Sequence, residues 1–135
     1  MSIWKPYEDL KGHPPDFRVT YRFYAESEGR ITRPAYQGLR SDFLYDGDDI
    51  KKIGIFCIHT QFEDMSGNVI MDKHLPVPTQ GTATMWILFP EMRRLVHVNR
   101  IKTGIKGYFM AGGTRLGEVE VTEVLGLHKN AETLR

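Results

Sequence analysis

Hydrophobic and polar residues alternate one by one between residues 17 and 24. The hydrophobic set is Phe17, Val19, Tyr21 and Phe23, and the polar residues between them are Arg18, Thr20 and Arg22. A period of two belongs to a β-strand, because successive side chains of a strand point to opposite faces. This segment therefore predicts a strand with one face in a hydrophobic core and the other in solvent.

Four further segments have the hydrophobic content of strands. Residues 53–60 and 82–89 are hydrophobic on both alternations, which is typical of a strand buried on both faces or in a tight barrel. Residues 105–110 and 117–125 flank Gly112-Gly113, where a tight turn would join them as a hairpin. No long stretch repeats hydrophobic residues at helical spacing. The pattern predicts an all-β domain of roughly six or seven strands, closed as a small barrel or a sandwich.

The 135 residues suit a single domain in three parts. Residues 1–16 contain Pro6, Gly12, Pro14 and Pro15, which predicts an extended N-terminal lead-in. Residues 17–126 carry the strand patterns and form the predicted barrel. Residues 127–135 are polar, and we expect a loosely held C-terminal tail.

Composition favours a soluble globular protein, with 41% hydrophobic and 26% charged residues. The single cysteine excludes an internal disulfide. Residues 1–6 lack the hydrophobic run of a secretion signal, and the longest apolar stretch, residues 85–89, is too short to span a bilayer. We therefore expect a cytoplasmic protein that does not contact membranes.

The motifs of several enzyme classes are absent from the sequence. No stretch fits a phosphate-binding loop, and the glycines of residues 112–117 fit a turn better than a dinucleotide fingerprint. The five histidines are scattered, so we predict no metal site and no cofactor. Asp46, Asp48 and Asp49 fit a turn better than a calcium loop.

Cys57 and His59 fall on the same face of a predicted strand, where a nucleophile and a base could meet. Side chains two positions apart along a strand are separated by about 7 Å, so a buried, inert cysteine is the favoured interpretation. A small hydrolase or nuclease that uses this pair, or the region of His97 with its basic neighbours, remains an alternative.

Charge is distributed unevenly although 18 basic residues nearly balance 17 acidic ones. Residues 92–117 contain no acid, and their basic residues are Arg93, Arg94, Arg100, Lys102, Lys106 and Arg115. Arg30, Arg33 and Arg40, interleaved with Tyr36, would form a second strip if the fold brings them beside the first. Such a surface could contact RNA phosphates. Solvated cations that pair with acids elsewhere are the alternative.

Two blocks of sequence resemble a known family. Residues 28–43 are Glu-Gly-Arg-Ile-Thr-Arg-Pro-Ala-Tyr-Gln-Gly-Leu-Arg-Ser-Asp-Phe, similar to the family run Gly-Gly-Arg-His-Thr-Pro, two aromatics, one residue, Gly-Tyr-Arg-Pro-Gln-Phe. Residues 112–117, Gly-Gly-Thr-Arg-Leu-Gly, resemble its Gly-Gly-Arg-Thr-Val-Gly hairpin, and residues 77–89 resemble the strand after its Met-Pro-Gly-Asp turn. From about residue 17 to residue 126 the chain resembles the C-terminal, third domain of elongation factor Tu and related translational GTPases.

The resemblance implies a six-stranded antiparallel barrel with Greek-key connections and no catalytic residue. In the family this barrel contacts the T-stem backbone of tRNA and packs against the GTPase domain. The chain departs from the family at Asp42, Asp46 and Ala111, has an extra residue at Arg33 and lacks a proline after Arg40. Two of these departures place negative charge toward a phosphate backbone, which is unfavourable.

The leading functional hypothesis is a non-enzymatic binding module that docks a protein or a tRNA-like RNA. Its predicted contact residues are Arg30, Arg33, Tyr36, Arg40, Arg93, Arg94, Arg100, Gly112, Gly113 and Arg115. In one form of this hypothesis the partner is related to translation, and the chain is an immunity or accessory protein against a toxin that targets translation. A separate hypothesis is a structural subunit, in which Trp4, Tyr7 and the lead-in wrap around a second copy of the chain.

Overall fold

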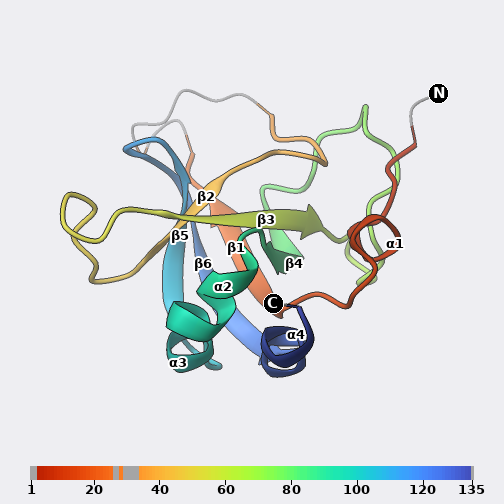
Figure 1. Ribbon diagram of the computed structural model, residues 1–135. Coiled ribbons are helices and arrows are strands. Elements are labelled where there is room, and N and C mark those ends of the chain that lie inside the picture. The colour runs from red at the N-terminus through yellow and green to blue at the C-terminus, as the bar shows by residue number, and fades with distance from the viewer. Residues whose placement is uncertain (1–2, 26–27, 29–33, 135) are drawn as a thin grey trace.

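The computed structural model describes residues 3–25, 28 and 34–134, and six strands form its centre. The strands are β1 (Phe17–Phe23), β2 (Asp42–Tyr45), β3 (Phe56–Phe62), β4 (Gln80–Ile87), β5 (Lys106–Ala111) and β6 (Thr114–Val124). They close as an antiparallel barrel in the order β1-β4-β3-β2-β5-β6 (Figure 1). Strands β2, β3 and β4 are consecutive neighbours, and β5 returns beside β2, which is a Greek-key arrangement. The predicted six-stranded antiparallel barrel is confirmed, and short helices accompany it.

The inside of the barrel is filled by the residues that alternation assigns to it. Phe17, Val19, Tyr21 and Phe23 of β1 are all buried, and they pack with aromatic residues of the other strands such as Phe62 and Phe109. Burial of such side chains removes large apolar areas from water and provides the main favourable term in folding. Gly107 of β5 leaves room for this packing, since a Cβ there would lie 2.7 Å from the Leu44 carbonyl oxygen.

The strand register divides the connections between two ends of the barrel. Phe23 pairs with Gly117 and Asp42 with Met110, so the chain leaves β1 and enters β2 at the end that carries the β5–β6 turn. Gly112 in that turn has a φ of 58°, as predicted for a tight turn. We call this the hairpin end. Residues 46–55 and 88–105 lie at the opposite end, which we call the helical end (Figure 1).

Helices close the helical end, contrary to the prediction that the chain has none. Helix α2 (Pro90–Met92), the wider π-type turn η2 (Arg93–His97) and α3 (Val98–Arg100) run on from one another. Their buried positions, Arg93, His97 and Ile101, recur every four residues, which is helical spacing. Two of these three residues are polar, so a search for hydrophobic periodicity passes over the segment.

Both terminal segments are more ordered than predicted. Helix α1 (Tyr7–Lys11) interrupts the lead-in that was expected to be extended, and it ends at Gly12, whose φ is 72°. Trp4 and Tyr7 pack on Trp86, which points outward from β4, and form a second small core on the wall of the barrel. The segment predicted as a loose tail forms α4 (Leu127–Thr133), which buries Leu127, Asn130 and Ala131.

Two predicted strand boundaries are also corrected. The hydrophobic run at residues 53–60 contributes a strand only from Phe56, and Ile53 lies in the preceding turn with 57% of its surface exposed. The run at residues 82–89 ends as a strand at Ile87, and Phe89 is 49% exposed. Hydrophobic residues therefore continue beyond the strands into solvent. In the described part of the chain no helix is long and apolar enough to cross a membrane.

Candidate functional site

The described parts of the two sequence blocks that carry the family resemblance lie at the same end of the barrel. Gly112 and Gly113 form the β5–β6 turn, and Tyr36 and Arg40 lie on the connection that leaves and returns at this hairpin end. Arg115 follows the turn, with its guanidinium carbon 3.8 Å from the centre of the Tyr108 ring. Arg30 and Arg33 lie outside the described residues.

The three remaining predicted arginines lie at the helical end, so the two predicted strips do not merge at one end of the barrel. Arg93 is buried and donates two hydrogen bonds to the Asp16 carboxylate, so its predicted role as an exposed contact is wrong. Arg100 makes a bidentate pair with Asp48 at 2.8 and 2.9 Å. Both arginines thus pair with acids from distant parts of the sequence, and Arg93 does so in the protein interior rather than in solvent. Arg94 has a buried Nε without a hydrogen-bond partner in the described part of the protein.

A different set of side chains gathers on the outer wall of the barrel along β3. Cys57, His59 and Gln61 alternate with the inward residues of this strand and face outward. Gln61 accepts hydrogen bonds from the indole nitrogen of Trp4 at 2.9 Å and from the backbone nitrogen of Tyr7 at 2.8 Å. These bonds hold the N-terminal segment against the strand. The Tyr7 ring is thereby stacked on the His59 imidazole, with centroids 5.9 Å apart.

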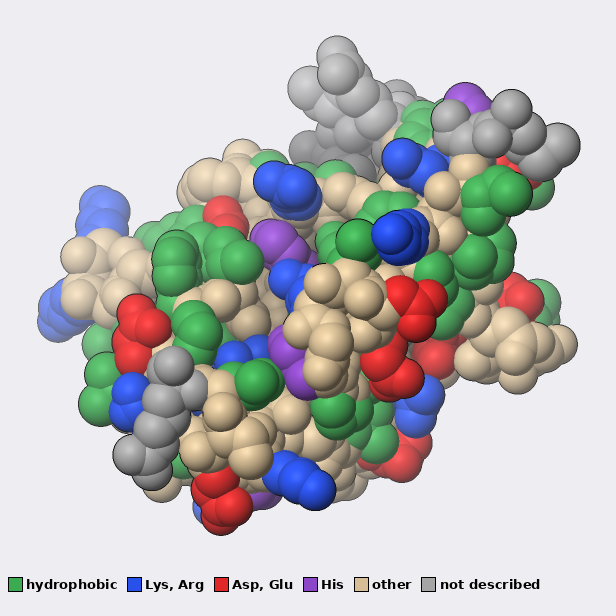
Figure 2. Space-filling view, turned by 45° about the vertical axis from the view of Figure 1, so that its right-hand side comes forward, with side chains coloured by type: hydrophobic (Ala, Val, Ile, Leu, Met, Phe, Trp, Pro, Cys, Tyr) green, Lys and Arg blue, Asp and Glu red, His purple; other side chains and the backbone are tan. Residues whose placement is uncertain are grey.

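Positive charge accumulates beside this stack. We define the cationic strip as Lys11, Arg40 and His59; the Nζ of Lys11 lies 5.1 Å from the centre of the Tyr7 ring. Within the described residues, neither Lys11 nor Arg40 makes an ion pair with a carboxylate. Figure 2, which brings the α1 side of the barrel forward, shows histidine and basic side chains together near the centre of this face.

Burial and neighbouring positive charge lower the pKa values of Lys11 and His59. Burial lowers the pKa of Lys11, and the nearby charges of Arg93 and Arg40 lower it further, while Asp16 acts in the opposite direction. Burial also lowers the pKa of His59, with additional lowering by Lys11 and Arg40 and partial compensation by Asp42. Like charges that disfavour each other's charged forms create a local positive potential. The strip is therefore suited to an anionic group.

An apolar pocket of about 270 Å³ adjoins the strip at the helical end. It is lined by Ile53, Ile55, Phe56, Cys57, Phe89, Met92 and His97. The half-exposed side chains of Ile53 and Phe89 belong to the hydrophobic runs that continue beyond the strands. Cys57 lines the pocket and is the outward neighbour of His59 along β3, so pocket and strip are continuous. We call this combined surface the β3 wall.

Cys57 and His59 do not have the arrangement of an activated nucleophile. Burial raises the pKa of the Cys57 thiol, and the neighbouring Asp42 raises it further. A thiol needs a lowered pKa to supply the reactive thiolate. His97 is hydrogen-bonded to another side chain, because its Nδ1 lies 2.6 Å from the Tyr45 hydroxyl in the protein interior. Burial lowers the pKa of His97 to about 4. Among the described residues no group of three or more metal-ligating side chains could hold an ion.

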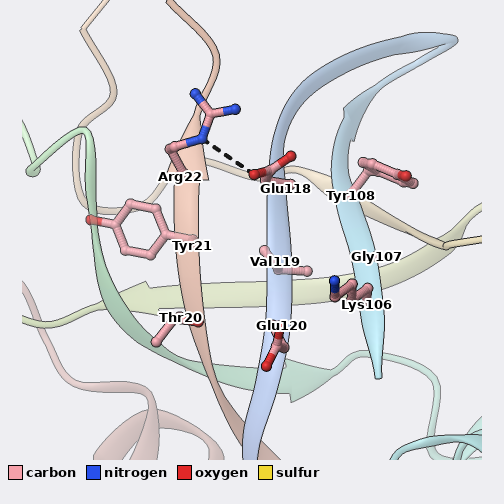
Figure 3. Close-up of a pocket in the computed structure, with 9 residues that line it drawn as sticks. All are labelled: Thr20, Tyr21, Arg22, Lys106, Gly107, Tyr108, Glu118, Val119 and Glu120. Carbon is pink, nitrogen blue, oxygen red and sulfur yellow. Dashed lines mark hydrogen bonds and ion pairs between the residues drawn. The ribbon is translucent and has the colours of Figure 1, made fainter. Parts of the chain in front are cut away.

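The opposite wall, formed by β1, β6 and β5, has a polar pocket of about 260 Å³ that is lined by two basic and two acidic side chains (Figure 3). Figure 3 shows Glu118 and Glu120 projecting from β6 between Arg22 of β1 and Lys106 of β5. Arg22 pairs with Glu118 at 3.2 Å and with Glu28 at 2.8 Å. Exposed ion pairs of this kind leave little net potential for a ligand.

Sequence patterns anticipated only part of the β3 wall. Arg40 and His59 were singled out, but Lys11, Ile53 and Phe89 were not. Lys11 was missed because its segment was expected to be extended, and Ile53 and Phe89 because hydrophobic runs were assigned to strands. In comparisons with known proteins, the sequence matches no family model and no curated protein.

Proposed function

We propose that this chain is a non-enzymatic module that docks another protein through the β3 wall. The observation that carries the proposal is the apolar pocket with its half-exposed rim of Ile53 and Phe89. Apolar side chains that remain in solvent around a pocket are typical of surfaces where a partner inserts an anchor residue. The adjoining cationic strip adds a charged margin to such an interface.

The resemblance to the third domain of elongation factor Tu is part of this proposal. The closed antiparallel barrel with a Greek-key order is the architecture that the resemblance implies. A translation-related role, including that of an immunity or accessory protein against a toxin that targets translation, follows from the resemblance alone.

A protein partner is favoured over RNA at the cationic strip because the aromatic rings beside the strip are already covered. Trp4, Tyr7 and Trp86 are 9%, 8% and 1% exposed, so their faces are not available to stack on bases. An RNA partner remains testable at the hairpin end, where Tyr36 is 41% exposed and Arg115 follows the turn.

The test compares capture from a native cell extract by the full chain and by two variants. The variant Ile53→Ser/Phe89→Ser removes the rim of the pocket. The control Met65→Ser removes an equally hydrophobic side chain that is fully exposed beside a different groove, next to Thr20 and Thr82. All three chains are first checked for equal melting temperatures.

We expect a protein that is captured by the wild type and by Met65→Ser, is lost with the double variant, and withstands nuclease treatment. This protein is then identified by mass spectrometry, produced alone and titrated against the three chains by calorimetry. Unchanged affinity of the purified protein for the double variant, or capture abolished by nuclease, contradicts the proposal.

A further inference from the structure

Among the described residues, no carboxylate forms an ion pair with Lys11 or Arg40 of the cationic strip. Lys11 and His59 are each half-buried, and Arg40 is the exposed member of the strip. A cation withdrawn from water without a partner loses hydration that only an anion or strong hydrogen-bond acceptors can replace. Asp42 is the carboxylate that acts on His59, and it also lies beside Cys57, with which it pairs across β2 and β3.

The strip and the pocket are arranged along one strand at a fixed spacing. Cys57, at the edge of the pocket, and His59, in the strip, are two residues apart on the same face of β3, which corresponds to about 7 Å. An extended peptide that lies along β3 repeats its own side chains on one face at the same interval. One side chain of such a peptide would reach the pocket while the next on that face reaches the strip.

We propose that the partner contributes an extended acidic segment, in which an apolar residue enters the pocket and a carboxylate two positions away contacts Lys11, Arg40 and His59. This proposal rests on the proposed function and specifies the chemistry of the partner. The negative charge of the segment complements the strip, and its apolar residue complements the pocket. A nucleic acid could also supply the negative charge, and it is the alternative occupant that the experiment tests.

The affinity of the protein for such a segment should depend on pH through His59. The groups that face His59 are Tyr7 and Lys11 from α1, Arg40 and Asp42 from the segment leading into β2, Cys57 from β3 and Trp86 from β4. In the free protein burial, together with the charges of Lys11 and Arg40, holds the pKa of His59 below its ordinary value. A bound carboxylate favours the imidazolium and raises this pKa. Binding therefore takes up a proton, and affinity should increase as pH falls from neutrality.

The experiment uses the full chain and three synthetic peptides that are extended in solution. The first contains Phe-Ser-Glu-Glu, the second replaces both glutamates by glutamine, and the third replaces phenylalanine by serine. Binding is followed by two-dimensional amide NMR and by the ring protons of His59. Three variants are compared, Lys11→Gln, Arg40→Gln and the control Lys129→Gln, which removes one charge from an exposed position on α4.

The first peptide should bind more tightly than either of the other two, by about tenfold. Lys11→Gln and Arg40→Gln should each weaken it by about fivefold, while Lys129→Gln should not, and only the first two variants should change the titration of His59. Equal binding of the glutamine peptide, no binding of the acidic peptide, or an unchanged affinity in Arg40→Gln overturns the inference.

Failure of this inference is distinguishable from failure of the proposed function. A captured protein whose binding depends on Ile53 and Phe89 but not on Lys11 or Arg40 supports docking at the pocket and rejects the acidic segment. Oligouridylate serves as an RNA probe in the same NMR assay. If it shifts His59 and the acidic peptide does not, the occupant of the strip is a nucleic acid and both proposals fall.

Discussion

Replacement of Asp16 by alanine should strongly destabilise the protein, because it leaves a buried arginine without its counter-charge. The Asp16 carboxylate is fully buried and accepts four hydrogen bonds. Arg93 donates two of them at 2.8 and 3.1 Å, the backbone nitrogen of Ile87 one at 2.8 Å, and the Asn130 side chain one at 3.0 Å. This carboxylate therefore ties the start of β1 to the end of β4, to η2 and to α4.

The magnitude follows from the burial of both partners. Arg93 is 2% exposed, and without Asp16 its guanidinium keeps only the carbonyl of Ile87 as an acceptor. Removal of one member of a buried ion pair costs about 3 to 5 kcal/mol. For a chain of this length, that cost corresponds to a fall of about 10 to 20 °C in melting temperature. Urea denaturation followed by circular dichroism measures the free energy of unfolding directly.

Two comparisons make this prediction refutable. Glu123→Ala breaks the Arg18–Glu123 pair, which has a similar distance of 3.0 Å but a carboxylate that is 57% exposed, and it should cost at most about 1 kcal/mol. Asp16→Leu/Arg93→Met removes both charges and should recover much of the lost stability. If Asp16→Ala costs no more than Glu123→Ala, or if the double variant is no better than the single one, the buried pair does not act as we describe.

Three further predictions concern single sites. Gly107→Ala should cost about 1 to 3 kcal/mol in chemical denaturation because the new Cβ meets the core, whereas Gly113→Ala, whose Cβ meets nothing within 4 Å, should be nearly neutral; equal effects would contradict the packing argument. Cys57 should alkylate more slowly at pH 8 than a free thiol, and Asp42→Asn should speed the reaction; a fast wild-type reaction would revive the hydrolase alternative. Because burial lowers the pKa of His97 to about 4, stability should fall by up to about 3 kcal/mol as pH falls from 6.5 to 4; a His97→Gln variant should lose less over that range, and identical pH profiles would contradict the assignment.

Alternation of hydrophobic and polar residues predicted the barrel, because a strand with one buried face places every second side chain in the core. In β1 every second residue faces the core, and the glycine turn between β5 and β6 fixes the hairpin. Residues 53–60 and 82–89 do not follow this alternation, because they are hydrophobic at successive positions. Their hydrophobic runs include Ile53 and Phe89, which face a surface pocket, and hydrophobicity alone does not distinguish a side chain in the core from one at a docking surface.

The acid-free segment 92–117 also led to a wrong prediction, because local sequence does not show which side chains become neighbours in the fold. Residues 92–117 contain no acid, which suggested a basic surface. However, Arg93 pairs with Asp16, 77 positions earlier in the chain, and Arg100 pairs with Asp48, 52 positions earlier. Such pairs form only when the barrel closes, so local sequence carries no sign of them. Conversely, the residues next to Lys11 in the sequence do not indicate a charged site. Lys11 becomes part of the cationic strip because Trp4 and Tyr7 fix α1 against β3.

Closure of the barrel narrows where a partner can bind. Because the six strands pair in a ring, recognition through side chains on the walls or through the connections at the two ends is favoured over extension of the sheet by a partner strand. On the wall of β1, β6 and β5, Arg18 and Arg22 are paired with glutamates. On the β3 wall, by contrast, Lys11 and Arg40 form no ion pair among the described residues and adjoin an apolar pocket. The groups of this surface come from α1, the segment before β2, the β2–β3 connection, β3 and the chain after β4. A partner that binds there contacts all five segments at once, so binding should stabilise the folded barrel.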